Sequence, residues 1–181
     1  MDEAKERLRN QITDSAGNVL YTYSAHWNIV NRLKAQHKGI KIAQIVLTAL
    51  STTGFLTSLI SGVSWLGWIG GLTSALALAL NLYMLNFNIT EDAKKHIDAA
   101  NELWDVREGY RSLLVDFDSL SEAEIRKRRD RLVDAVSRVN KNYPGTDEKA
   151  FAKAQRDIGK YTFDEGESER LLNIEGKPKD A

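Results

Sequence analysis

The chain of 181 residues contains no cysteine, and it carries no charge in one long internal stretch. Without cysteine it forms neither disulfides nor cysteine-based zinc sites, which is compatible with exposure to the cytosol. Its 25 Lys and Arg residues balance 25 Asp and Glu residues, so the overall charge does not point to a nucleic acid polymer or an acidic partner. Residues 1–10 are highly charged, and we therefore expect no cleavable signal peptide.

The most informative absence is that of charge between Lys41 and Glu91. The 49 residues 42–90 contain no Asp, Glu, Lys, Arg or His, and the other 132 residues carry all 50 charged side chains. Surface helices of soluble domains combine an apolar face with a charged one. We therefore expect the helices inside this stretch to be apolar on all faces.

Two apolar runs, residues 42–60 and 65–85, fill this stretch. As helices they would be about 28 and 31 Å long, which matches a hydrocarbon core of about 30 Å. Two tryptophans begin the second run and Tyr83 lies near its end, where interfacial aromatic residues belong. The sequence predicts a transmembrane hairpin with its turn at residues 61–64. The alternative is a helical pair buried in a larger soluble bundle.

Basic residues flank the predicted hairpin on one side. Residues 15–41 contain four Lys or Arg and no acid, whereas the turn carries no charge. The positive-inside rule then places both termini in the cytoplasm. We expect an all-α, multi-pass chain with a cytoplasmic amphipathic helical segment (1–41), the two-span hairpin (42–85) and a cytoplasmic helical region with a tail (86–181).

Turn-forming residues divide the segment before the hairpin. We expect a charged helix over residues 2–13, which "DSAGN" at residues 14–18 interrupts. A second helix then leads into the first span, with a possible bend at Gly39, and places four apolar residues on one face: Leu20, Tyr23, Trp27 and Val30. This face either lies on the inner membrane surface or packs on the helices that follow the hairpin, and we favour the packing.

The segment after the hairpin predicts three helices. Thr90 is expected to cap a long helix that ends near Val115. Ser121 and Glu124 form a capping box that opens the next helix, and Thr146 is expected to cap the last one. The apolar stripe of the long helix includes Ala93, Ile97, Ala100, Trp104 and Leu114, with Leu103 and Tyr110 at its edge.

No arrangement of residues indicates catalysis, a metal or a cofactor. The glycines of "WLGWIGG" lie in an apolar run, and the three histidines have no metal-ligand pairing on one helical face. The acidic residues within 164–169 lack the spacing of a calcium loop. The basic run at residues 126–131 either contacts anionic headgroups or a nucleotide or forms the exposed face of its helix, and we favour the exposed face.

Small and polar residues follow a line along each predicted span. The first span contributes Gln44, Thr48, Ser51, Ser58 and Gly62, and the second contributes Gly67, Gly71, Ser74 and Asn81, with Asn88 near its lower end. Gly62, Gly67 and Gly71 are predicted to allow close helix packing. The polar residues either line a pore in an oligomer or hold helices together. Gln44 and Asn81 are expected at the same depth.

The order of segments resembles the SLATT family of bacterial two-span effector domains. The residues that carry the resemblance are the approach "YSAHWNIVNRLKAQHKGIKIAQIVL", the tip "SGVSW" and the exit "EDAKKHIDAANELWDVREGYRSLLVDF". The similarity extends over about residues 21–158. It rests on the order of these segments and brings no catalytic residues with it.

The resemblance implies a membrane effector of prokaryotic conflict systems such as anti-phage defence. Such a protein oligomerises in the inner membrane and forms a pore, which kills or arrests the infected cell. Its partners would be the lipid bilayer, further copies of the chain, and a cyclic oligonucleotide signal or a sensor protein. We recognise no separate ligand-binding domain in this sequence, and we therefore expect a trigger to act on its helical region or through a partner. The alternatives are a non-conducting two-span adaptor for a cytoplasmic partner and a housekeeping membrane protein.

Overall fold

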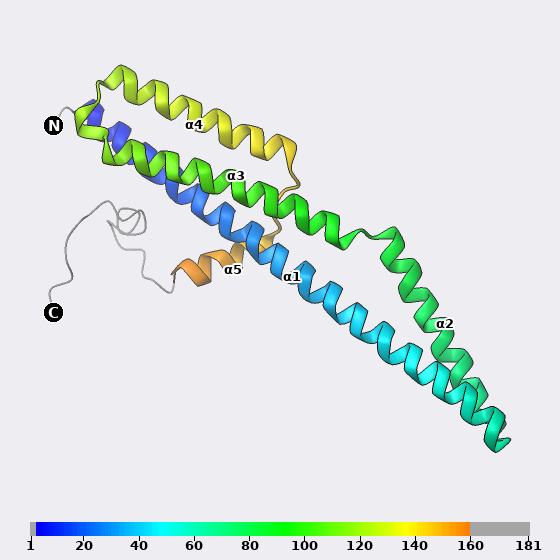
Figure 1. The fold of residues 1–181 in the computed structure, drawn as a ribbon. Coiled ribbons are helices and arrows are strands. Elements are labelled where there is room, and N and C mark those ends of the chain that lie inside the picture. Colours follow the sequence, from blue (N-terminus) through cyan, green and yellow to red (C-terminus); the bar gives the residue numbers. More distant parts are fainter. Residues whose placement is uncertain (1–2, 160–181) are drawn as a thin grey trace. The chain divides into compact units, whose positions relative to one another are not determined.

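The computed structural model describes residues 3–159, which are helical apart from short connections (Figure 1). The elements are α1 (Glu3–Ser61), α2 (Ser64–Asn86), α3 (Ile89–Val115), the 3-10 helix η1 (Phe117–Ser119), α4 (Glu122–Asn142) and α5 (Glu148–Gly159). No strand occurs among these residues, so the all-α prediction is confirmed. The predicted tail, with its acidic residues 164–169, lies outside the described residues.

Helix α1 continues through the residues that were expected to interrupt it. The helix includes both the 14–18 segment and Gly39, so the expected break after residue 13 is wrong. Ala16 and Val19 are buried in the core, and the hydroxyl of Ser15 donates a hydrogen bond to the carbonyl of Gln11. Burial of one face therefore outweighs the weak helix propensity of these residues.

The chain divides into two compact units, and α1 contributes to both. The described part of the first unit comprises residues 3–30 and 95–159, and the second unit comprises residues 31–94. The first unit is a helical bundle, and the second contains the hairpin formed by α1 and α2. The N-terminal end of the chain thus shares a hydrophobic core with the helices after the hairpin.

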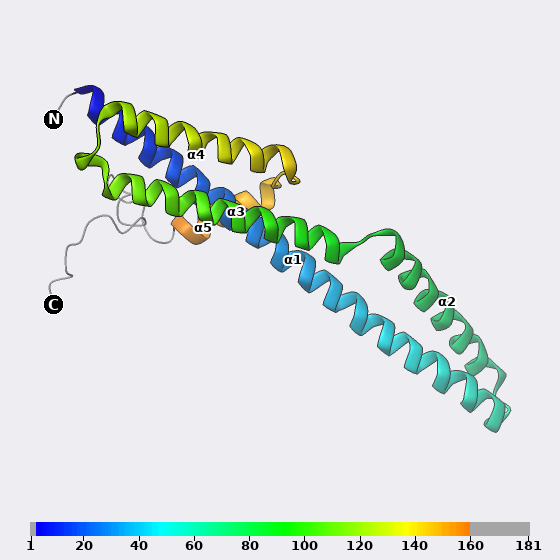
Figure 2. The ribbon, with the colours of Figure 1, turned by 45° about the horizontal axis from the view of Figure 1, so that its top comes forward.

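The core of the first unit lies between α1, α3 and α4, which lie side by side in both views (Figures 1 and 2). Its residues include Leu8, Ile12, Ala16 and Val19 of α1, Leu103, Val106, Tyr110, Leu113 and Leu114 of α3, Phe117 of η1, and Ile125 and Val139 of α4. Tyr23 of α1 packs against this core, with its ring centroid 5.4 Å from that of Trp104. The expectation that this face of α1 packs on the later helices is confirmed.

The buried face of α3 is rotated relative to the prediction. Leu103 and Tyr110, which were placed at the edge of the stripe, are almost completely buried, whereas Trp104 is 43% exposed. Helix α3 is enclosed by α1 on one side and α4 on another, so its buried face is broader than one stripe.

The caps of the later helices agree with the prediction at one of three positions. The hydroxyl of Ser121 accepts a hydrogen bond from the amide of Glu124, as expected. The expected caps Thr90 and Thr146 are wrong. Asn88 accepts from the amide of Glu91 at the start of α3, and Asp147 accepts from the amide of Ala150 at the start of α5. The acceptor is instead an Asn two residues before Thr90 and an Asp one residue after Thr146.

Candidate functional site

The two helices of the hairpin meet along residues that recur at steps of three and four. The less exposed positions on this face are Gln44, Leu47, Ser51, Gly54 and Ser58 of α1, and Leu66, Gly70, Thr73, Ala77, Leu80 and Met84 of α2. This spacing averages 3.5 residues, which is typical of two helices packed at a shallow angle.

Glycines allow the backbones of α1 and α2 to approach closely. A Cβ placed on Gly70 would lie 3.0 Å from the carbonyl oxygen of Ser51, and one on Gly54 would lie 3.2 Å from that of Leu66. A Cβ on Gly67 would lie 3.1 Å from the hydroxyl of Ser58, so Gly67 also lies close to α1. Sequence reasoning missed Gly54 and Gly70. The sequence signal that could have located them is their place in the repeat of about 3.5 residues along each helix. The prediction relied instead on the four-residue step from Gly67 to Gly71.

Gly71 and Gly62 make no close contact between α1 and α2. No atom lies within 4 Å of a Cβ placed on Gly71, which is exposed, so it does not pack between these two helices. Gly62 lies in the turn with a φ of 70°, a conformation that glycine adopts without steric cost. Its amide donates to the carbonyl of Ser58, which closes α1. A role of Gly71 between copies of the chain stays a prediction.

Two side-chain hydrogen bonds connect the helices of the hairpin. The hydroxyl of Ser51 donates to the carbonyl of Gly70 over 2.9 Å. The amide nitrogen Nε2 of Gln44 donates to Oδ1 of Asn81, also over 2.9 Å. The expectation that Gln44 and Asn81 lie at the same depth is therefore confirmed. The hydrogen bond shows that packing supplies at least one partner to each amide.

The remaining polar residues of the predicted seam lie off this contact face. Thr48 is exposed and donates to the carbonyl of Gln44 in its own helix, which satisfies its hydroxyl without any outside partner. Ser74 is exposed, and Asn88 caps α3. The seam therefore divides into residues that contact the other helix (Gln44, Ser51, Ser58 and Asn81) and residues that do not (Thr48, Ser74 and Asn88). Whether any of them lines a pore stays a prediction.

The apolar surface of the hairpin is left uncovered. Both helices contain a stretch long and apolar enough to cross a membrane, and the structure buries none of this stretch in the first and only 11% in the second. Trp65 and Trp68, next to the turn, are 60% and 81% exposed. The alternative of a pair buried in a larger bundle requires the opposite, and the described residues exclude it within one copy of the chain.

A pair of buried histidines lies in the first unit. The Nδ1 atoms of His26 in α1 and His96 in α3 are 2.8 Å apart, so one ring donates a hydrogen bond to the lone pair of the other. Burial, together with the neighbouring His96, lowers the pKa of His26 to about 4. Within residues 3–159, no group of three His, Asp or Glu side chains is arranged to hold a metal ion.

Acidic neighbours neutralise much of the basic run of α4. Arg126 pairs with Glu122, and Arg128 lies 3.4 Å from both Glu124 and Asp116. Arg129 pairs with Asp130 and also donates to Gln11 of α1. These contacts support the interpretation of the run as an exposed, ion-paired helix face.

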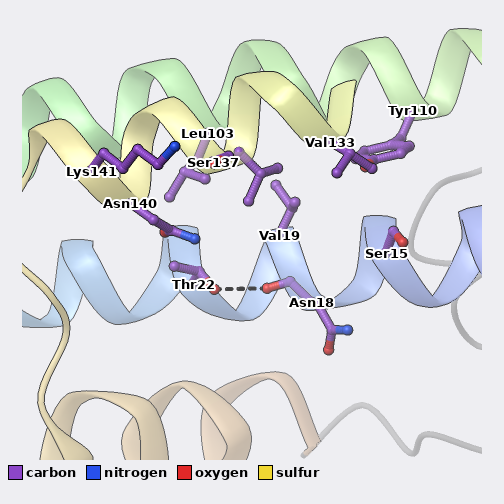
Figure 3. A pocket seen from close by; sticks show the side chains of 11 residues that line it. Ser15, Asn18, Val19, Thr22, Leu103, Tyr110, Val133, Ser137, Asn140 and Lys141 are labelled. Carbon is purple, nitrogen blue, oxygen red and sulfur yellow. Dashed lines mark hydrogen bonds between the residues drawn. The ribbon is translucent and has the colours of Figure 1, made fainter. Parts of the chain in front are cut away.

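A cavity of about 550 Å³ opens between α1, α3 and α4 of the first unit (Figure 3). Helix α1 contributes Ser15, Asn18, Val19 and Thr22, and α4 contributes Val133, Val136, Ser137, Asn140 and Lys141, with Leu103 and Tyr110 of α3 between them. Burial raises the pKa of the Tyr110 phenol, which therefore stays protonated at neutral pH. The sequence contained no motif that would have located this cavity, because its residues come from three separate segments.

Residues 3–159 are all-helical and contain two long, apolar and uncovered helices joined by a tight turn, which fit a two-span membrane protein. The model of the SMODS and SLOG-associating 2TM effector domain family 4 matches residues 8–167, so the chain belongs to this family. The SLATT resemblance is thereby confirmed, and the family is one of membrane effector domains of conflict systems, not a known enzyme family. Comparisons with curated proteins and with solved structures find no match.

Proposed function

We propose that the protein oligomerises in the bacterial inner membrane and permeabilises it in an anti-phage or related conflict system, as an abortive-infection effector. A sensor protein or a nucleotide second messenger, such as a cyclic oligonucleotide, triggers the change. Family membership supports the effector role. The uncovered apolar helices support the membrane location. The protein needs no cofactor and carries out no catalysis in this proposal.

The close contact between α1 and α2 is the observation that carries the proposal of assembly. The Gly70 backbone lies against that of Ser51, so one hairpin encloses no passage between its helices. Conduction therefore requires several copies, whose outer faces would surround the path. Asn81 is exposed and uses its Oδ1 in the bond to Gln44, which leaves its amide hydrogens for water or a neighbouring copy.

The proposed orientation, with both termini in the cytoplasm, follows from the basic flanks of the hairpin. A Ser61→Cys variant should react with an impermeant thiol reagent added to intact cells, because Ser61 lies at the turn. A Ser112→Cys variant, placed at an exposed position of α3, should react only after lysis. Because the natural chain has no cysteine, any label on the purified variant comes from the introduced thiol. Labelling of Ser112→Cys in intact cells would contradict this orientation.

Dye and ion leakage from liposomes tests the pore itself. We expect leakage that rises steeply with the number of chains per liposome. The variants to compare are Gln44→Leu, Asn81→Leu and the double variant, each checked for oligomer size in detergent. If the amides only hold helices together, each single variant should impair assembly more than the double variant, since one amide is then left unpaired. If they line the path, the assembled double variant should leak least. Full leakage from an intact double variant would eliminate the polar ring.

The position of the seam also favours a second function, that of a non-conducting adaptor. Gln44, Ser51 and Ser58 lie on the face between α1 and α2, where they serve packing. An adaptor would insert and assemble equally well but cause no leakage at any density. Loss of membrane potential in cells that express the protein distinguishes the two functions.

A further inference from the structure

The cavity between α1, α3 and α4 has the size and lining of a small-molecule site. Such sites have volumes of about 300–1,000 Å³ and combine an apolar surface with a few polar groups. This cavity has about 550 Å³. Val19, Leu103 and Val136 form apolar parts of its wall, and polar side chains from α1 and α4 lie on either side of the opening (Figure 3).

Several polar side chains at this cavity have no partner within the part of the chain that the structure describes. The side chains of Asn18, Ser137, Asn140 and Lys141 make no hydrogen bond or ion pair with residues 3–159, although the backbone carbonyl of Asn18 accepts from the hydroxyl of Thr22. Together they offer amide donors and acceptors, a hydroxyl and an ammonium group. Elsewhere on α4 the arginines at 126, 128 and 129 are engaged with acidic neighbours, so this end of the helix differs in having unengaged groups.

A second cavity, of about 340 Å³, extends the first along α1. It shares Thr22 and Asn140 with the larger cavity and reaches His26 and the turn at Pro144. We call the two cavities together the α1–α4 groove. Two adjoining cavities that share lining residues suit an elongated molecule better than a compact ion.

The charged groups that line the α1–α4 groove favour a negatively charged ligand. Among residues 3–159, Lys141 is the only lining residue with a full charge at neutral pH, and no Asp or Glu of this range lines either cavity. His26 at the far end is neutral, because burial lowers its pKa. An anion therefore gains a favourable interaction with Lys141, which a cation does not. The carboxylate beside the second cavity, that of Glu102, accepts a hydrogen bond from the hydroxyl of Tyr143.

We propose that the α1–α4 groove binds a soluble organic anion with an apolar or aromatic body and one negatively charged group. The body lies on Val19, Leu103 and Val136, and the charged group lies at Lys141. Ser137 and Asn140 hydrogen-bond its polar edge. Because its walls come from α1 and α4, the bound molecule bridges these two helices and holds α4 against α1.

Calorimetric titration of the full chain tests this proposal, with two probes of equal size and opposite charge. The probes are 1-naphthalenesulfonate and 1-naphthylmethylammonium, and the protein is held in phosphatidylcholine nanodiscs. We expect the sulfonate to bind at least five-fold more tightly than the ammonium. Lys141→Gln should weaken sulfonate binding about two- to five-fold, the effect of one exposed ion pair. Lys127→Gln, on the same helix but outside the groove, should leave it unchanged.

Filling the cavity provides the second arm of the experiment. Ser137→Phe places a ring in the space of the ligand and should weaken sulfonate binding at least ten-fold, and Ser137→Leu serves if the larger side chain impairs folding. Equal affinity for the two probes, or unchanged binding in both filled variants, would overturn the proposal. So would loss of binding in phosphatidylglycerol nanodiscs, which would show that a lipid headgroup occupies the groove. No step depends on leakage, so the outcome is independent of the proposed pore.

Discussion

Two adjacent glycines of α2 provide a matched test of the hairpin contact. A Cβ on Gly70 would lie 3.0 Å from the carbonyl oxygen of Ser51 and 3.1 Å from the amide nitrogen of Phe55, whereas a Cβ on Gly71 would meet no atom within 4 Å. The atoms near Gly70 belong to the backbone and cannot rotate away, so Gly70→Ala must push α1 and α2 apart. Overpacking of this kind costs about 1–3 kcal/mol.

The comparison of Gly70→Ala with Gly71→Ala isolates that cost. Both substitutions raise helix propensity by the same amount, about 1 kcal/mol in water, so this contribution cancels in the difference. We expect Gly71→Ala to be neutral or stabilising and Gly70→Ala to weaken the closed hairpin by about 1–3 kcal/mol relative to it. At 1.4 kcal/mol for each factor of ten, the equilibrium between closed and separated helices shifts about 5- to 150-fold.

Oxidative crosslinking in increasing concentrations of sodium dodecyl sulfate measures this shift. Gln44→Cys and Asn81→Cys serve as the reporter pair, because these side chains contact each other and the chain contains no other thiol. The Gly70→Ala protein should lose crosslinking at a lower detergent fraction than the Gly71→Ala protein. Equal midpoints, or a greater loss for Gly71→Ala, would refute the proposed packing of α1 against α2.

Three further predictions concern the first unit and the turn. Folding lowers the pKa of His26 from 6.5 to about 4, so the contribution of neutral His26 to stability is present above pH 6.5 and is lost as the pH falls toward 4. The loss is about 3 kcal/mol. The thermal unfolding temperature of His26→Gln should therefore depend less on pH over this range than that of the natural protein. Asp147→Ala should lower stability by about 0.5–2 kcal/mol through loss of the α5 cap, while Thr146→Ala should not, and equal effects in thermal unfolding would contradict the assignment. Gly62→Ala should destabilise the turn by about 1 kcal/mol through its positive φ, although the site has open space; an unchanged crosslinking midpoint would count against that strain.

The sequence by itself determined the two-span hairpin and the helical character of the chain. Forty-nine residues without charge admit few other structures, because apolar helices of this length need lipid or complete burial. The ends of α1 and α2 at the turn, the end of α3 and the start of α4 followed from local signals, namely the uncharged turn at residues 61–64, the helix end expected near Val115 and the cap at Ser121. These features depend on residues near one another in the chain, which a pattern records directly.

Only the tertiary structure decided which faces meet. The segment at residues 14–18 stays helical because Ala16 and Val19 are buried against α3 and α4, which lie about one hundred residues away in sequence. Gly70 rather than Gly71 packs in the hairpin because a rotation of α2 by one residue, about 100°, exchanges the inner and outer faces. The cavity beside Lys141 likewise depends on three helices from distant segments. Helix rotation and long-range packing are set by the sum of many small contacts, which no local pattern contains.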